Sequence, residues 1–260
     1  MKDGASLLAV DVGNTNTVLG LFQGADLMRH WRLTSRREST SDEIAISVEA
    51  LLASSPLQRK PEHVIVANVV PPLRFPLRQA LRQVLGREPI FVEPGVKTGM
   101  PILYDVPQEV GADRIVNAVA AYERLGGPCI VVDFGTATTF DVVTEKGEYA
   151  GGVIVPGISI SAEALFEKAA RLWRVEIRRP EKVVGKTTTS SIQSGLYFGY
   201  LSLVDGMIAR IAQEIGRKPR VIATGGLAEL FGGGSEAIEL VDPLLTLTGL
   251  RLIHERNRGG

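Results

Sequence analysis

Several features that mark other protein classes are scarce or missing in this chain of 260 residues. It has one cysteine, so an internal disulfide is impossible, and Cys129 lies in the apolar run CIVVD, which predicts a core position. No segment has about 18 uninterrupted apolar residues, and the beginning MKDGASLLAVDVG lacks the pattern of a signal peptide. These absences predict a cytoplasmic protein without a membrane partner.

An excess of either charge sign is also lacking, because Lys+Arg and Asp+Glu both total 29. Such a chain has no overall field that would attract nucleic acid. The basic stretch RLWRVEIRRPEK contains one aromatic residue, Trp173, and is typical of a solvated loop beside a helix. The three histidines, His30, His63 and His254, have no ligand spacing. The sequence therefore predicts neither a nucleic-acid partner nor a metal site built from histidines.

An internal repeat is the most informative feature that the sequence does have. The segment LLAVDVGNTNTVLGLFQG, from Leu7, reads like CIVVDFGTATTFDVVTEKG, from Cys129. In each, an apolar run ends in Asp-x-Gly and leads through a Thr-rich turn into a run of alternating β-branched residues, which predicts a β-hairpin. The two acids, Asp11 and Asp133, lie close to half the chain apart. The repeat predicts two domains, residues 1–115 and 116–260.

The elements after each hairpin predict how each domain is built. A third strand is expected over residues 27–33, and Thr40-Ser-Asp-Glu43 has the spacing of a capping box before the helical pattern IAISVEALLA. Strands and helices then alternate, and the second half repeats this order. We expect an α/β protein with two mixed five-stranded sheets that face a central cleft, a layout suited to binding a nucleotide.

The two Asp-x-Gly turns carry the expected phosphate chemistry. A carboxylate at the end of a strand, followed by Gly and small hydroxyl residues, can hold a cation and phosphate oxygens together. Asp11 suits Mg²⁺, and the residues that follow it offer N–H and hydroxyl donors; Gly135, Thr136 and Thr138 repeat this arrangement. A single Asp-x-Gly hairpin is more often a plain tight turn. The matched pair favours a functional role.

Two further glycine-containing segments need to be distinguished. In Ala223-Thr-Gly-Gly-Leu227 a short strand runs into Gly225 and Gly226, which can approach an adenosine closely, although a simple strand-to-helix turn fits the same residues. Val184-Gly-Lys-Thr187 resembles the end of a P-loop. That pattern requires Gly where this chain has Pro180, so a P-loop is not predicted.

The segment Val110-Gly-Ala-Asp-Arg114 carries the candidate catalytic acid. Phosphoryl transfer to an alcohol requires a carboxylate near the hydroxyl, and Asp113 is the candidate base. Arg114 could bind a carboxylate or a phosphate with two hydrogen bonds. The spacing alone favours an exposed Asp-Arg pair on a solvated helix face.

These motifs together resemble a known family. DVGNTNT, Tyr104 with GADR, DFGTATT, GGVIVPG, GKTTTSSIQSG, ATGGLA and DPLLTLTGL occur in the order found in type III pantothenate kinases, from about Leu7 to Leu250. The resemblance implies duplicated ribonuclease-H-like domains of the actin-like ATPase type. It also implies ATP-dependent phosphorylation of pantothenate to 4′-phosphopantothenate, which opens coenzyme A synthesis.

The resemblance also implies roles for individual residues. Asp113 is implied to be the general base, Asp11 to lie at the Mg²⁺ site, and Asp133 to bind K⁺ or NH₄⁺. The residues predicted to bind ATP are Asp11, Val12, Gly13, Asn14, Thr15, Asn16, Thr17, Val18, Thr136, Gly225 and Gly226. Those predicted to bind pantothenate are Tyr104, Gly111, Ala112, Asp113, Arg114 and Thr188. Thr187 stands where the family usually has Asn.

The resemblance further implies a homodimer in which the second subunit completes the pantothenate pocket. Two alternatives share the scaffold: a non-catalytic accessory factor for transcription, and a kinase with another small alcohol as acceptor. Presence of Asp11, Asp113 and Asp133 argues against the first, because a binding module has no need for all three carboxylates. Tyr104 and GADR are the features that distinguish pantothenate from other acceptors.

Overall fold

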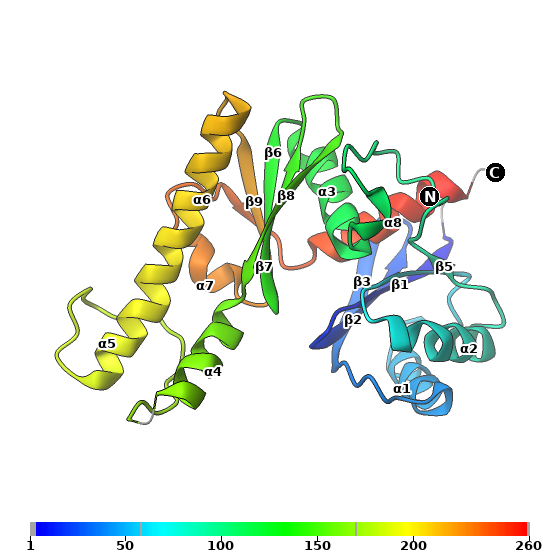
Figure 1. Ribbon diagram of the computed structural model, residues 1–260. Coiled ribbons are helices and arrows are strands. Elements are labelled where there is room, and N and C mark those ends of the chain that lie inside the picture. The colour runs from blue at the N-terminus through cyan, green and yellow to red at the C-terminus, as the bar shows by residue number, and fades with distance from the viewer. Residues whose placement is uncertain (1–3, 58, 170, 259–260) are drawn as a thin grey trace. The chain divides into compact units, whose positions relative to one another are not determined.

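The computed structural model describes residues 4–57, 59–169 and 171–258. Its elements divide between two compact units (Figure 1). Unit 1 contains the described residues of Met1–Pro101, Asp105–Ala120 and Leu245–Gly260, and unit 2 contains Ile102–Tyr104 and Ala121–Leu244. No helix in the described part of the chain is long and apolar enough to cross a bilayer.

Unit 1 is built on a five-stranded mixed sheet with the order β3-β2-β1-β4-β5. Its strands are β1 (Ser6–Val12), β2 (Asn16–Gln23), β3 (Asp26–Thr34), β4 (His63–Asn68) and β5 (Ile90–Phe91). Its helices are α1 (Ser41–Ala53), η1 (Pro71–Leu73), α2 (Arg74–Leu85), η2 (Pro107–Glu109), the first part of α3 (Ala112–Leu125) and α8 (Leu245–Asn257). The hairpin β1–β2 and strand β3 are antiparallel, and β4 and β5 join in parallel.

Helices cover both faces of the sheet in unit 1. On one face, alternate residues of β1 such as Leu8 and Val10 pack against α1 and α2 in one buried cluster. On the other face, Leu247 of α8 lies against Gly20 of β2, where a Cβ atom would come within 2.8 Å of the leucine. The predicted capping box starts α1, since the Glu43 N–H donates to the Thr40 hydroxyl at 3.3 Å and the Thr40 N–H donates to Glu43 Oε2 at 2.8 Å.

Unit 2 has a second five-stranded mixed sheet, ordered β10-β9-β6-β7-β8. Its strands are β6 (Cys129–Phe134), β7 (Ala137–Val143), β8 (Tyr149–Pro156), β9 (Arg220–Gly225) and β10 (Leu240–Val241). Its helices are the end of α3, α4 (Ile158–Lys168), α5 (Thr188–Ser194), the π-helical turn η3 (Gly195–Gly199), α6 (Tyr200–Ile215) and α7 (Ala228–Gly232). Cys129 is fully buried and free, and burial raises its thiol pKa to about 12, so it is a packing residue as predicted.

The two mixed sheets confirm the predicted α/β fold, but the division of the chain differs from the predicted boundary at residue 115. Helix α8 packs on β1 and β4 and so belongs to unit 1, although it ends the chain. The reason is its buried face, whose residues are Leu245, Leu247, Leu250 and Ile253. Its last turn includes His254, which is buried, and the helix continues to Asn257.

Candidate active site

The turn between β1 and β2 presents the first predicted phosphate-binding residues. The Gly13 N–H donates to the Asn16 carbonyl oxygen at 3.0 Å, and a Cβ atom on Gly13 would lie 3.1 Å from that oxygen. Asn14 and Thr15 are exposed at the tip of the turn, whereas Val12 is buried in the core. Val12 can therefore contact a ligand through its backbone but not through its side chain.

The segment after β3 braces this turn. The Ser35 N–H donates to the Thr15 carbonyl oxygen at 2.9 Å, and the hydroxyl oxygens of Thr17 and Ser35 lie 2.8 Å apart. Arg37 Nη2 donates to the side-chain oxygen of Asn14 at 3.1 Å. These contacts hold the turn in one conformation while leaving its outer surface accessible.

The start of α3 positions the predicted base. The helix begins at Ala112, so Gly111 lies just before its first residue. The Arg114 N–H donates to Asp113 Oδ1 at 2.8 Å, and a Cβ atom on Gly111 would lie 2.5 Å from the same oxygen. Glycine is thus required for this carboxylate position. Burial raises the pKa of the Asp113 carboxyl. The hydrogen bond from the Arg114 N–H and the positive charge of the Arg114 side chain lower it.

Unit 1 brings Asp113 to the end of the sheet that carries Asp11. The Val69 N–H, just after β4, donates to the Val12 carbonyl oxygen at 3.0 Å, and a Cβ atom on Gly111 would lie 3.6 Å from the Val69 side chain. The start of α3 therefore adjoins the carboxyl ends of β1 and β4. Ligand sites of open α/β sheets form at such strand ends.

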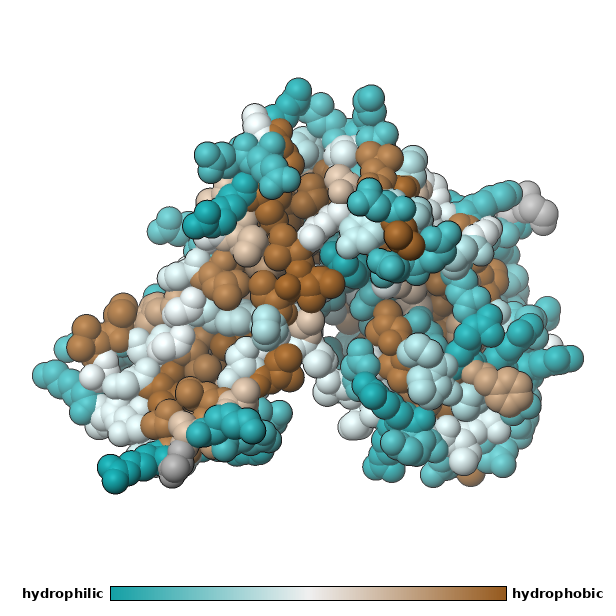
Figure 2. All heavy atoms as spheres, viewed as in Figure 1, coloured by the Kyte–Doolittle hydropathy of each residue, from teal (hydrophilic) through white to brown (hydrophobic). Residues whose placement is uncertain are grey.

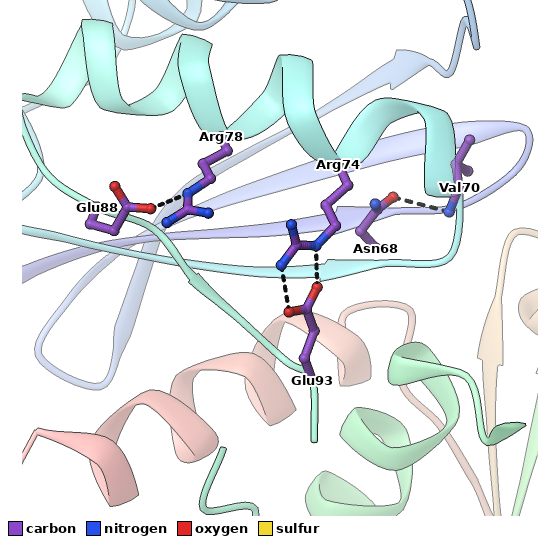
Figure 3. Close-up of polar contacts among 6 residues, drawn as sticks. All are labelled: Asn68, Val70, Arg74, Arg78, Glu88 and Glu93. Carbon is purple, nitrogen blue, oxygen red and sulfur yellow. Dashed lines mark hydrogen bonds and ion pairs between the residues drawn. The ribbon is translucent and has the colours of Figure 1, made fainter. Parts of the chain in front are cut away.

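Polar contacts fix the chain between β4 and α2, as Figure 3 shows. Asn68 Oδ1 accepts from the Val70 N–H at 3.0 Å and closes the turn around Val69. Arg74 donates twice to the Glu93 carboxylate, at 2.5 and 2.8 Å. The Asn68 contact fixes the turn that brings Val69 against Gly111, whereas the ion pair links the start of α2 to the segment after β5.

The equivalent turn of unit 2 is closed differently. The Gly135 N–H donates to the Ala137 carbonyl oxygen at 3.1 Å, and the Gly157 N–H donates to the Thr136 carbonyl oxygen at 3.0 Å. Gly135 and Thr136 are exposed, as a phosphate contact requires. The Thr138 hydroxyl is fully buried and accepts from the Tyr200 hydroxyl at 2.6 Å, so its expected role as a phosphate donor is wrong.

Asp133 lies beside the first glycine of the ATGG segment. Strand β9 runs parallel to β6 and pairs Phe134 with Gly225, whose φ is +94°. A Cβ atom on Gly225 would lie 2.4 Å from Asp133 Oδ1, so only glycine fits. The structure thus brings together two predicted site residues, Asp133 and Gly225, from segments far apart in the sequence.

The predicted pantothenate residues divide between the two units. Gly111 to Arg114 belong to unit 1, whereas Tyr104 and Thr188 belong to unit 2. Thr188 is the first residue of α5 and lines a cavity of about 790 Å³ together with Lys186 and Leu196. Thr187 is the N-cap of this helix and accepts from the Ser190 N–H at 3.1 Å, a role that Asn performs equally well.

Several solved structures have a fold similar to that of this chain. A ROK family glucokinase from Streptomyces griseus, solved with glucose and AMPPNP, has a TM-score of 0.55 at 13% identity and covers 98% of this chain and 100% of its own. A Campylobacter jejuni protein named as a Baf family transcriptional activator has a TM-score of 0.60 at 19% identity, with 96% and 98% covered. These similarities concern the fold alone and agree with the predicted actin-like ATPase fold.

Comparison with sequences is more specific. The model of the type III pantothenate kinase family matches residues 7–210. A type III pantothenate kinase of Koribacter versatilis is 55% identical over 263 residues, covering 97% of this chain and 96% of that protein. One from Anaeromyxobacter sp. strain K is 56% identical over 253 residues, covering 97% and 100%. The chain belongs to the type III pantothenate kinase family.

Proposed function

We propose that this protein transfers the γ-phosphoryl group of ATP to the primary hydroxyl of pantothenate and so forms 4′-phosphopantothenate, the first step of coenzyme A synthesis. The observation that carries the proposal is the Asp113 carboxylate, held by the Arg114 N–H next to the end of the sheet that bears Asp11. The chain is 55% identical in sequence to a protein named as a type III pantothenate kinase, which supports pantothenate as the acceptor.

Asp113 acts as the general base in this proposal. A carboxylate in a partly buried position with a raised pKa accepts the hydroxyl proton more readily than an ordinary aspartate does. Arg114 is buried beside it, and its charge favours the ionised carboxylate before the hydroxyl arrives. The residues proposed to bind pantothenate with it are Tyr104, Gly111, Ala112, Arg114 and Thr188.

The phosphates of ATP are bound by exposed backbone in this proposal. The turn from Gly13 to Thr17 offers N–H and hydroxyl groups, and Thr136, Gly225 and Gly226 contribute from unit 2. Such donors neutralise and align the transferred group, so catalysis is mostly positioning. The remaining residues assigned to ATP are Asp11, Val12 and Val18.

Cations are proposed at the two repeated carboxylates. Among residues 4–57, 59–169 and 171–258, no group of three or more His, Cys, Asp or Glu side chains could hold a metal ion. A Mg²⁺ ion at Asp11 would take its other ligands from phosphate oxygens and water, as its chemistry favours. Asp133, confined against the backbone of β9, is proposed to bind K⁺ or NH₄⁺. Both cations supply positive charge to the phosphates.

A homodimer is proposed from the apolar surface of unit 2. Figure 2 shows hydrophobic residues, in brown, gathered over β8 and α4. The exposed large side chains there are Ile154, Ile160 and Leu165. Strand β8 is also the edge of its sheet, a position that proteins usually cover. We place the enzyme in the cytoplasm, where ATP is available, and propose neither a nucleic-acid nor a membrane partner.

The direct test is ADP release by the purified protein with ATP, Mg²⁺ and pantothenate, with K⁺ exchanged for Na⁺. Turnover that requires pantothenate and K⁺ or NH₄⁺ supports the proposal. ADP release with another small alcohol, and none with pantothenate, would favour the kinase with a different acceptor. No ADP release with any acceptor would favour the accessory factor for transcription.

A further inference from the structure

Unit 2 contains a buried carboxylate that the proposed mechanism does not use. Asp141 of β7 is fully buried; its Oδ1 accepts from the Tyr149 hydroxyl at 2.7 Å and its Oδ2 accepts from the Thr139 hydroxyl at 2.9 Å. Burial of a carboxylate is unfavourable unless its oxygens are hydrogen-bonded, and an aliphatic residue would fill a core position without that cost. What the carboxylate adds is a fixed orientation for its two partners.

One of these partners, Tyr149, holds the segment that carries Tyr104. The Leu103 N–H donates to the Tyr149 carbonyl oxygen at 2.8 Å, and Ile102 forms a parallel bridge with Tyr149. The rings of Tyr104 and Tyr149 lie 6.3 Å apart between centroids, inclined by 56°. Residues 102–104 therefore belong to unit 2, although the chain before and after them belongs to unit 1.

The backbone of β8 leaves room for the Tyr104 ring. Gly151 follows Tyr149 in β8 with φ +117°, and a Cβ atom there would lie 3.7 Å from the Tyr104 ring. The Tyr104 ring thus rests over a glycine and beside a fully buried tyrosine. Because the Asp141 bond fixes the Tyr149 hydroxyl, rotation of the Tyr149 ring away from Tyr104 would leave a buried carboxylate oxygen with one partner fewer.

The other partner, Thr139, leads to Asp133. These two residues are paired across β6 and β7, so their side chains lie on the same face of the sheet. A row of polar residues therefore crosses unit 2 from the Asp133 carboxylate through Thr139, Asp141 and Tyr149 to Tyr104. Such a row connects a proposed cation ligand with a proposed pantothenate contact.

We propose that Asp141 and Tyr149 are positioning residues that hold Tyr104 for pantothenate binding. The proposal rests on the proposed function, because Tyr104 is taken to touch pantothenate. Neither residue reaches the reacting atoms in this scheme; they act through the orientation of Tyr104. Their loss is therefore expected to weaken pantothenate binding while leaving ATP binding and the chemical step largely intact.

The test compares Tyr149→Phe with Tyr122→Phe. Both changes remove one tyrosine hydroxyl from unit 2, but Tyr122 donates to the Glu145 carbonyl oxygen, at 3.3 Å, on an exposed turn. We expect Tyr149→Phe to raise the KM for pantothenate about three- to tenfold, with kcat and the KM for ATP within about twofold, and Tyr122→Phe to change none of them. An unchanged KM for pantothenate in Tyr149→Phe would overturn the proposal.

A second measurement does not depend on turnover. Hydrogen exchange of the Leu103 amide reports directly on the bond to Tyr149, and it should become at least about fivefold faster in Tyr149→Phe but not in Tyr122→Phe. Equal exchange in both variants would contradict the positioning role. If the wild-type protein fails to phosphorylate pantothenate, the proposed function fails, whereas the exchange result still decides whether these residues hold the segment. Asp141→Asn carries the same test should Tyr149→Phe not fold.

Discussion

The two hairpins of the repeat share a backbone plan and differ in what surrounds the carboxylate. At the end of β4, beside Asp11, stands Asn68, whose side chain closes a turn. At the equivalent end of β9, beside Asp133, stands Gly225, which has no side chain and a positive φ. The two hairpins thus have the same strand topology but different residues beside their carboxylates. We infer that the first carboxylate serves a hydrated divalent ion and the second a cation enclosed by backbone.

Loss of the proposed base should have the largest effect, because neither hairpin can replace it. We expect Asp113→Asn to lower kcat about 10²- to 10⁴-fold, measured by ADP release, with unchanged ATP binding by calorimetry. Because burial raises the Asp113 pKa above its usual 3.8, the acid limb of kcat/KM in the wild type should lie above that value and disappear in the variant. Full turnover by Asp113→Asn would remove this residue from the mechanism.

The difference between the hairpins can be tested by the same substitution in both. Asp11→Asn is expected to raise the Mg²⁺ concentration for half-maximal activity about 10- to 100-fold, and Asp133→Asn to raise the K⁺ concentration by a similar factor, because each removes a charged ligand. Titration of one cation at saturating levels of the other measures both. If the two variants respond alike to both cations, the proposed division of roles is incorrect.

The close approach of Gly225 to Asp133 gives a third test. Gly225→Ala must strain the backbone and displace the carboxylate, so we expect it to lower stability by about 1–3 kcal/mol and also to weaken K⁺ activation. Gly216→Ala is the matched control, since Gly216 has φ +69° but no atom within 4 Å of a Cβ. It should destabilise by about 1 kcal/mol without affecting K⁺. Urea unfolding and K⁺ titration measure the two effects.

The smallest effect is expected from a pair of histidines in unit 1, which makes stability depend on pH. His254 of α8 packs against His63 of β4, with ring centroids 4.8 Å apart, and burial lowers the His254 pKa from 6.5 to about 4. The unfolded chain therefore binds a proton that the folded chain does not, between these two values. Stability should be full above pH 6.5, decrease by about 2 kcal/mol by pH 5, and decrease further as the pH falls towards 4.

Urea midpoints at pH 7.5 and 5 measure this dependence. His254→Leu should flatten it, because the buried group that titrates is then gone. His30→Leu, at an exposed position of β3, should leave it as in the wild type. Identical pH dependence in His254→Leu and the wild type would show that the histidine pair does not control the acid stability.

Features that depend on neighbouring residues could be predicted from the sequence. The hairpins around Asp11 and Asp133 were predictable because alternation and turn residues act over a few positions, and the capping box at Thr40 is equally local. The order of the motifs also identified the family. Asp113 could be nominated from its segment, although its raised pKa could not, since burial depends on the whole unit.

Which distant segments meet could not be predicted in this way and is known from the folded structure. Helix α8 packs in unit 1, although it follows unit 2 in the chain. The segment that carries Tyr104 lies beside β8 in unit 2, and Gly225 lies against Asp133. The Thr138 hydroxyl lies in the core, where Tyr200 donates to it. Each of these outcomes depends on packing between residues far apart in the chain, and local pattern carries no information about such partners.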